Sequence, residues 1–443
     1  MRKKIFLTIL LTGLSFGTVF SQGLNKSKLD SLFNILIEKN KGMGSLSLSK
    51  NGTVLYSRAI GYSFISGMEK ISATEKTKYR IGSITKMFTA TMIFQLIEEG
   101  KLNLTTTLDK YFPKLPNADK ITISNLLNHR SGLHEFTDDP DYDTWMALPK
   151  TQDEILALIS KHNVDFQPNE KADYSNSNYV ILGYILEMVS KQSYLKNLEE
   201  RITSKIGLSN TYAGSKINKN NNESFSYRFD GNWEQANETD MSIPSGAGCI
   251  VSTPTDLTKF IEALFSLKLV SENSLTQMKT ITDNYGMGMR QIPFYTKRAY
   301  GHNGRIDGFV SNLAYFPEDS LAISFCSNGE IYPVNGILIG VLSIYFNKEY
   351  SIPTFNDISI TTEDLDKYLG VYSTPELPAL TIIITKDNLI LMAQGTGEPA
   401  IPLEATEKDI FEFLRAGIKL EFKPTKNQMI YSQGGESFTM TRE

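Results

Sequence analysis

The stretch "YRIGSITKMFTATMIFQLIEEG", residues 79–100, changes from a strand-like run to an amphipathic helix, and the change falls at a serine. Ser83 follows "YRI" and Gly82 directly, and Lys86 comes three residues later. Residues three apart at a helix start share a face, so the Lys86 amine can approach the Ser83 hydroxyl. The unpaired N–H groups of a helix start also favour an oxyanion. The stretch therefore predicts either a nucleophile with its base or a capping serine beside a solvated lysine.

The spacing Ser-x-x-Lys occurs three times, and its surroundings separate the three copies. Ser47–Lys50 straddles a strand end, where alternation sends the two side chains to opposite faces. Ser193 follows "SKQ" at the start of a surface helix, which predicts an N-cap. Only Ser83 lies at a strand-to-helix junction with an apolar helix behind it.

Two further stretches carry polar side chains suited to a cleft. Tyr174 and Asn176 flank a serine just before a helix, and in extended backbone a phenol and a carboxamide two apart point the same way. In "AYGHNGRIDGFVSN", His302, Asn303 and Gly304 open a strand, where a glycine lets a substrate or another backbone come close. Taken alone, His302 is better interpreted as a strand-end histidine with a local hydrogen bond.

In this order, the three elements resemble the penicillin-recognising serine hydrolases, and Ser-x-x-Lys is among their signatures. The class C β-lactamases and the D-alanyl-D-alanine carboxypeptidase, D-aminopeptidase and esterase group are the most similar. "ISNLLNHRSGLHEF", "PSGAGCIVSTPTDLTKF" and "YGMGM" are typical of the same group, and the resemblance covers roughly residues 25–347. It implies an antiparallel sheet of the β-lactamase type flanked by helices, with an all-helical subdomain.

The resemblance also implies which residues carry the chemistry. Ser83 corresponds to the acylated nucleophile, Lys86 to its base partner, and Tyr174 to the proton carrier for the leaving group and the hydrolytic water. The backbone N–H groups of Ser83 and Arg305 would form the oxyanion hole.

Substrate binding would fall to Asn176 and to the strand-opening segment of His302, Asn303 and Gly304. Here the chain departs from the penicillinases, which have Lys-Thr-Gly at this point and use the lysine and the hydroxyl to hold a substrate carboxylate. Histidine and an amide replace them, a variant associated in this family with peptidases and esterases.

Strand periodicity at both ends of the hydrolase region and helical periodicity between them predict an α+β fold with an antiparallel sheet. A hairpin is expected around Asn51-Gly52. After a linker-like stretch, short alternating runs predict a small antiparallel β domain that resembles the lipocalin-like appendage of some relatives. The expected parts are a signal peptide at 1–21, a β-lactamase-like domain at 22–350, a linker at 351–362 and a lipocalin-like β domain at 363–443.

The N-terminus has three basic residues, a short apolar run and a small residue, Ser21, before Gln22, the pattern of a secretory signal peptide. We therefore expect an exported bacterial protein, periplasmic or secreted, with no stable membrane anchor after cleavage. A net charge of −4 offers no basic surface for nucleic acid. The expected partner is a small-molecule or peptide substrate, and the oligomeric state stays open.

The sequence gives only weak indications of a metal site or of redox chemistry. His129, His134 and the acidic "TDDPDYD" loosely suggest a metal site, but dispersed loop carboxylates are usually solvated, so we predict no metal and no cofactor. Cys249 and Cys326 lie in apolar surroundings, and either a disulfide or two buried thiols would fit.

The sequence thus predicts an exported serine hydrolase that acts through an acyl-enzyme on amide or ester bonds. D-amino-acid peptides and small esters are the expected substrates, with β-lactams as a further class. The alternative is a low-turnover penicillin-binding protein that senses β-lactams or cell-wall fragments.

Overall fold

The computed structural model describes residues 24–355, 361–387, 390–398 and 400–443. The predicted signal peptide at 1–21 and part of the predicted linker, 356–360, lie outside these residues and stay predictions. None of the helices in the described ranges is long and apolar enough to cross a bilayer.

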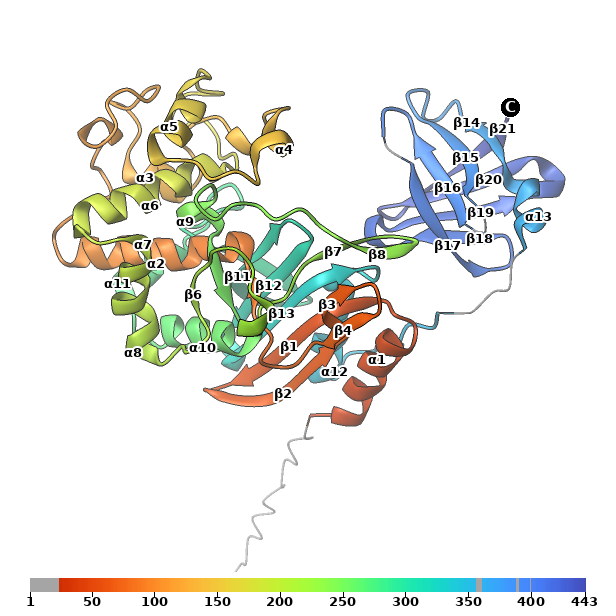
Figure 1. The fold of residues 1–443 in the computed structure, drawn as a ribbon, viewed down its shortest axis with the longest axis horizontal. Coiled ribbons are helices and arrows are strands. Elements are labelled where there is room, and N and C mark those ends of the chain that lie inside the picture. The colour runs from red at the N-terminus through yellow and green to blue at the C-terminus, as the bar shows by residue number, and fades with distance from the viewer. Residues whose placement is uncertain (1–23, 356–360, 388–389, 399) are drawn as a thin grey trace, which may run out of the picture.

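A six-stranded antiparallel sheet forms the centre of the larger part of the molecule (Figure 1). Across the sheet, its strands are β10 (Arg290–Phe294), β11 (Lys297–Ile306), β12 (Phe309–Phe316), β13 (Leu321–Glu330), β1 (Gly42–Lys50) and β2 (Thr53–Ile60). The β1–β2 hairpin turns at Asn51 and Gly52, both with positive φ (51° and 78°), as a tight hairpin turn requires. The expected hairpin is confirmed, and it joins the sheet beside the strand that comes last in sequence.

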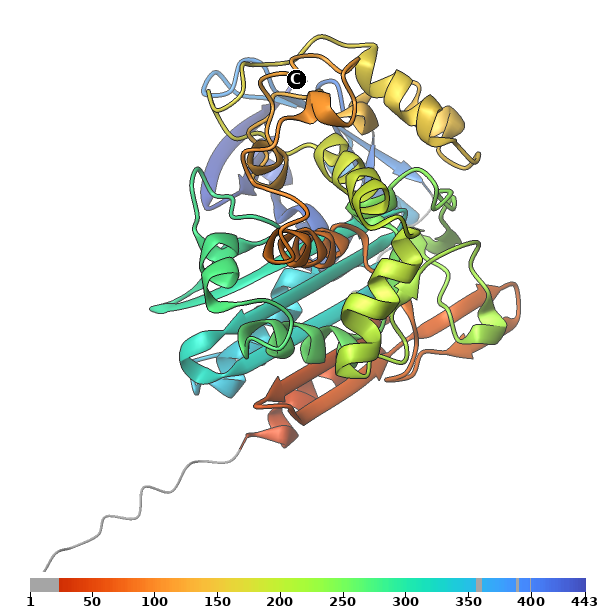
Figure 2. The same cartoon turned by 90° about the vertical axis from the view of Figure 1, so that its left-hand side faces the viewer.

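Helices cover both faces of this sheet (Figures 1 and 2). Alternate residues of β13 show the division: Ile323 and Phe325 belong to the core under α1 (Lys26–Glu38) and α12 (Val334–Tyr345). Cys326, one residue on, belongs to the core on the other face. That second core is built from α2 (Thr85–Glu98), α6 (Asn176–Ser190) and α10 (Pro254–Phe265), together with the helical region that extends beyond the sheet. The predicted α+β class is confirmed.

Helix α2 differs from the amphipathic helix expected from its sequence. Every residue from Thr85 to Leu96 is buried, because α2 lies between α6, the short helix α9 (Ser245–Gly248) and the rest of the second core. A helix buried on all sides is held rigidly, which suits an element that starts at a candidate nucleophile.

The C-terminal region is a closed eight-stranded antiparallel barrel, which confirms the predicted small β domain. Its strands are β14 (Gly370–Ser373), β15 (Thr381–Asp387), β16 (Ile390–Gly395), β17 (Ile401–Glu407), β18 (Ile410–Phe413), β19 (Ile418–Lys423), β20 (Gln428–Gln433) and β21 (Glu436–Arg442). Buried apolar side chains, among them Leu420, Phe422 and Met429, fill its interior. Lys41 and Glu404 form an ion pair between the barrel and the hydrolase region.

The two cysteines are free thiols. Both are buried, and burial raises the pKa of Cys249 and of Cys326 to about 12. Of the two possibilities left open by the sequence, the structure has the buried thiols.

Candidate active site

Ser83 lies in a single 3₁₀ turn, η1 (Gly82–Ile84), between strand β5 (Tyr79–Arg80) and helix α2. It is half-buried and lines a cleft of about 360 Å³. Gly82 has φ +50°, and a Cβ there would lie 2.7 Å from the carbonyl oxygen of Arg305 on β11. Glycine therefore permits both the backbone turn and the close approach of β11 to the serine.

The structure brings Lys86 and Tyr174 to the Ser83 hydroxyl. Lys86 Nζ lies 3.0 Å and the Tyr174 hydroxyl 2.7 Å from Ser83 Oγ. Lys86 is one turn along α2, whereas Tyr174 comes from the extended segment before α6, so two elements converge on one oxygen. This is the geometry required of a nucleophile with a base and a second proton-transfer group.

Lys86 has the surroundings of a neutral amine. It donates to Asn176 Oδ1 at 2.7 Å and to the Ala247 carbonyl oxygen at 2.9 Å. A neutral amine has two N–H groups, so these two acceptors satisfy it and leave its lone pair for the Ser83 hydroxyl. Burial lowers the pKa of Lys86 to about 7; the Glu135 carboxylate works against that shift and the Arg290 guanidinium adds to it.

We expect kcat/KM to rise with pH through about 7 and then to level off. Below its pKa Lys86 carries a proton and cannot accept one from Ser83, so the rate should fall about tenfold per pH unit on the acid side. A pH profile with a neutral ester, whose own charge does not change, measures this limb.

The matched variant is Glu135→Gln. Removing this carboxylate takes away a charge that favours protonated Lys86, so the limb should move to lower pH. A limb that stays at the same pH in Glu135→Gln would show that Lys86 does not act as the base.

The predicted oxyanion hole is compatible with the backbone. Ser83 and Arg305 line the same cleft. Gly304 makes this possible, because a Cβ there would overlap the carbonyl oxygen of Ile81, just before the nucleophile turn. Two glycines, 82 and 304, therefore let the segment at Ser83 and the start of β11 lie against each other.

His302 is buried and electrically neutral in this fold. Burial and the nearby Lys86 lower the pKa of His302 to about 3. Its Nδ1 atom lies 2.5 Å from the carbonyl oxygen of Asn303, which can only accept, so the Nδ1 atom carries the proton and Nε2 has a lone pair. The imidazole ring centre is 6.2 Å from that of Tyr174, at the edge of the site. The side chain of Asn303 is exposed.

The other two Ser-x-x-Lys pairs have the structural roles expected of them. Ser193 is the N-cap of α7 (Tyr194–Leu198), and its hydroxyl accepts from the Lys196 N–H. Ser47 faces α10 through Thr258, while Lys50 reaches toward Tyr345 of α12 on the opposite face of the sheet.

Four residues that surround the site were assigned no catalytic role from the sequence. His129 stacks on Tyr174 with ring centres 4.5 Å apart, and the Glu135 carboxylate accepts from the Asn176 N–H. The guanidinium of Arg290 lies over the rings of Tyr174 (5.5 Å) and Tyr285 (4.4 Å). His129, Glu135 and Tyr285 belong to stretches recognised as typical of the family, which is the signal that could have found them.

Comparison with known proteins places this geometry in a family. The model of the beta-lactamase family matches residues 37–337, which is more than half of the chain. The chain belongs to the beta-lactamase family. The match includes every element that forms the site, from β1 through β13.

Two curated relatives and two solved structures illustrate the extent of the likeness. Penicillin-binding protein 4* of Bacillus subtilis is 26% identical over 93% of this chain and 98% of its own length. Teichoic acid D-alanine hydrolase of Staphylococcus aureus is 28% identical over 70% of this chain and 74% of its own. The D-amino acid amidase of Ochrobactrum anthropi, crystallised with L-phenylalanine, is 26% identical with a TM-score of 0.64, over 73% of this chain and 98% of that one.

The octameric penicillin-binding protein homologue of Pyrococcus abyssi shares the fold over a longer span. The TM-score is 0.65 at 23% identity, over 94% of this chain and all of that one. The family match, with the likeness to the teichoic acid D-alanine hydrolase and to the D-amino acid amidase, shows that this chain is a serine hydrolase acting on amide or ester bonds.

Proposed function

We propose that this chain is an exported hydrolase that forms an acyl-enzyme on Ser83 and cleaves amides or esters of D-amino acids, together with small esters. The observation that carries the proposal is the convergence of Lys86 Nζ and the Tyr174 hydroxyl on Ser83 Oγ, at 3.0 and 2.7 Å. A serine that lines a cleft and is hydrogen-bonded to two proton-transfer groups is suited to nucleophilic attack on a carbonyl carbon.

In the proposed reaction, neutral Lys86 takes the Ser83 proton as Oγ attacks the substrate carbonyl. The backbone N–H groups of Ser83 and Arg305 stabilise the negative oxygen that forms. Tyr174 passes a proton to the leaving group and recovers one from Lys86, so both groups return to their starting states while the acyl group stays on Ser83 as an ester. A water molecule then attacks this ester: the same groups take up the water proton and return a proton to Ser83 Oγ as the bond from Oγ to the acyl carbon breaks. Asn176 orients the substrate amide while it also holds Lys86.

The substrate class follows from two further observations. Two relatives are named a D-amino acid amidase and a teichoic acid D-alanine hydrolase, and both names contain a D-amino acid. His302 is neutral, so it offers no fixed cation where a penicillinase has its lysine. Both points favour D-aminoacyl esters and amides over β-lactams, whose carboxylate has no such partner at His302.

Export is part of the proposal and rests on the N-terminal sequence alone. Three basic residues, an apolar run and a small residue at Ser21 support a cleaved signal peptide. N-terminal sequencing of protein recovered from outside the cytoplasm should begin near Gln22. A chain that starts at Met1 and stays in the cytoplasm would contradict export.

A substrate panel with the mature protein tests the activity. We expect D-alanyl and D-phenylalanyl esters and amides to be turned over faster than their L-enantiomers, and a β-lactam such as nitrocefin more slowly. Mass spectrometry of quenched reactions should find the acyl group on Ser83. Equal rates for D- and L-substrates would contradict the D-specificity, and an acyl group on another residue would contradict the site.

The likeness to penicillin-binding protein 4* over 93% of this chain favours a second candidate, a penicillin-binding protein with little turnover. Such a protein would give one equivalent of acyl-enzyme from a labelled penicillin, with no steady-state hydrolysis of any ester or amide in the panel. Burst and steady-state rates measured on the same samples distinguish the two.

A further inference from the structure

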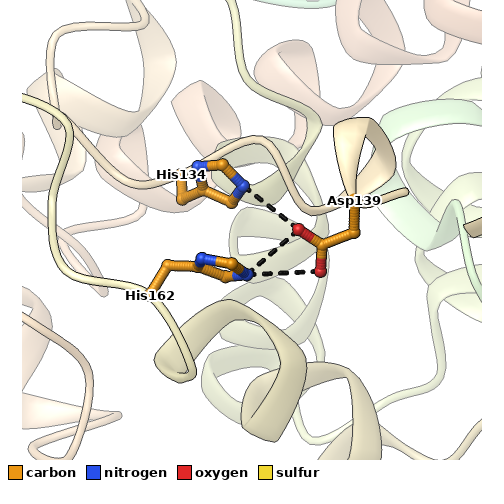
Figure 3. A group of neighbouring side chains, drawn as sticks. All are labelled: His134, Asp139 and His162. Atoms are coloured by element: carbon orange, nitrogen blue, oxygen red, sulfur yellow. Dashed lines mark hydrogen bonds and ion pairs between the residues drawn. The ribbon is translucent and has the colours of Figure 1, made fainter. Parts of the chain in front are cut away.

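The side chains of His134, Asp139 and His162 point toward one another and form a small cluster (Figure 3). His134 precedes the short turn η3 (Phe136–Asp138), Asp139 ends that turn, and His162 follows α5 (Gln152–Ser160). The Nε2 atoms of His134 and His162 lie 3.2 and 3.0 Å from Asp139 Oδ1. The sequence suggests a group of His134 with His129, but in the structure His129 stacks on Tyr174, whereas His134 stacks on His162 with ring centres 4.1 Å apart.

The Asp139 carboxylate lies at the centre of this cluster, and its negative charge needs a nearby positive charge to balance it. The Asp139 side chain is only 3% exposed. Among the described residues, the side-chain hydrogen bonds and ion pairs of Asp139 are those with the two imidazoles. A buried carboxylate is costly unless a cation balances it, and no lysine or arginine in the described ranges contacts this one.

The donor set is one that transition metals prefer. Each residue offers one ligand atom, and these atoms lie within 4.8 Å of one another. At the usual Zn–N and Zn–O distances, neighbouring ligands of a tetrahedral zinc ion lie about 3.3 Å apart, close to the two N–O separations found here. Two imidazoles and one carboxylate with a water molecule in the fourth position would complete such a site.

A second carboxylate, that of Asp165, lies beside His134 outside the three-residue cluster. His134 Nδ1 lies 3.2 Å from Asp165 Oδ1. Metal-bound histidines typically donate the other ring N–H to a carboxylate, which fixes the ring and strengthens the ligand. Three observations therefore agree: the ligand set, a buried carboxylate whose side-chain partners among the described residues are the two imidazoles, and the outer carboxylate of Asp165.

We propose that His134, Asp139 and His162 bind a divalent transition-metal ion of the zinc type, with Asp165 orienting His134. The ion stabilises the loop that forms one wall of the active site. The carbonyl oxygen of His134 accepts from the Ser177 hydroxyl at 2.5 Å, at the start of α6. Glu135, the next residue, accepts from the Asn176 N–H. The site is separate from the serine chemistry, and the ion takes no part in the proposed acyl transfer.

The rival explanation is a metal-free cluster in which protonated imidazoles donate to the two carboxylates. In that case the same side chains would hold the loop without any ion. Metal titration of the chelator-treated, tag-free mature chain separates the two. Co²⁺ serves as the optical probe, because its visible absorption reports ligation directly, and Zn²⁺ serves as the competitor.

We expect one equivalent of Co²⁺ to bind with a visible ligand-field band, Zn²⁺ to displace it, and Zn²⁺ to raise the unfolding temperature by several degrees. His162→Ala should lose the band and the thermal shift. Asp165→Asn should retain the band but weaken binding by about 10–100-fold. Asp141→Asn, an exposed carboxylate in the same acidic loop, is the control and should bind as the unmodified chain does.

Absence of a saturable Co²⁺ band in the unmodified chain would overturn the proposal, as would a band that persists in His162→Ala. Circular dichroism establishes that each variant is folded. If His162→Ala does not fold, the titration of the unmodified chain and of Asp165→Asn decides. Hydrolysis of the ester panel by chelator-treated protein is measured separately, so failure of this site leaves the proposed function intact, and the reverse also holds.

Discussion

Ser83→Ala should abolish acyl-enzyme formation and lower kcat/KM for the best ester by roughly 10⁴-fold or more, the range found when a catalytic serine is removed. Among the described residues, the Ser83 hydroxyl is the one group that is hydrogen-bonded to both Lys86 Nζ and the Tyr174 hydroxyl, and the substitution removes it. Steady-state kinetics together with mass spectrometry after treatment with a fluorophosphonate measure both effects.

Ser193→Ala is the matched control, because Ser193 has the same Ser-x-x-Lys spacing but caps α7. It should cost about 1 kcal/mol of stability and leave kcat/KM unchanged. If Ser83→Ala keeps the kcat/KM of the native protein, or if the fluorophosphonate labels another serine in the native protein, the nucleophile lies elsewhere.

Arg80→Met should lower the free energy of unfolding by about 3–5 kcal/mol, the cost of removing one partner from a buried ion pair. The guanidinium bonds to Asp307 Oδ2 at 3.0 Å and to Glu238 Oε1 at 2.6 Å. It also donates to the carbonyl oxygens of Ser215 and Thr239. The Asp307 side chain is 1% exposed, so the substitution leaves a buried charge without its cation. Urea unfolding followed by circular dichroism measures the loss.

Two variants test the cause of that loss. Lys196→Met removes an exposed cation that pairs with Glu199 and Glu200, and it should leave the free energy of unfolding nearly unchanged, because solvent screens exposed ion pairs. Adding Asp307→Asn to Arg80→Met should recover part of the stability, because it removes the stranded charge. Suppose that the double variant is less stable than Arg80→Met and that the difference equals the loss caused by Asp307→Asn alone. The two residues would then not be coupled.

The features predicted correctly from the sequence depend on short separations along the chain. The turn at Asn51-Gly52 needs two adjacent residues that tolerate positive φ, and the Ser83–Lys86 pair needs one helical turn. The barrel strands follow one another as a meander, so their alternating pattern is local as well. In each case neighbours in sequence are neighbours in space.

What the sequence could not provide depends on contacts between distant segments. Glu135 lies just before η3 and Arg290 begins β10, so the two groups that influence the pKa of Lys86 come from distant parts of the chain and no local pattern predicts them. His134 and His162 are far apart in the sequence, yet their rings stack with centres 4.1 Å apart, so no local pattern predicts that they form one cluster. The sequence of α2 predicts an amphipathic helix. Its burial on every side depends on packing against α6 and α9, which come much later in the chain, so the local pattern does not reveal it.

The order of the central sheet has a consequence for how the molecule acquires activity. Strand β1 pairs with β13, so Gly42 stays unpaired on that side until Glu330 is available. The barrel, by contrast, pairs successive strands and closes with the single return of β21 to β14. Contacts between distant residues form slowly because long loops must close first. During refolding from denaturant, the barrel should therefore regain its structure early, while esterase activity returns only in the last phase, when the two ends of the hydrolase region meet.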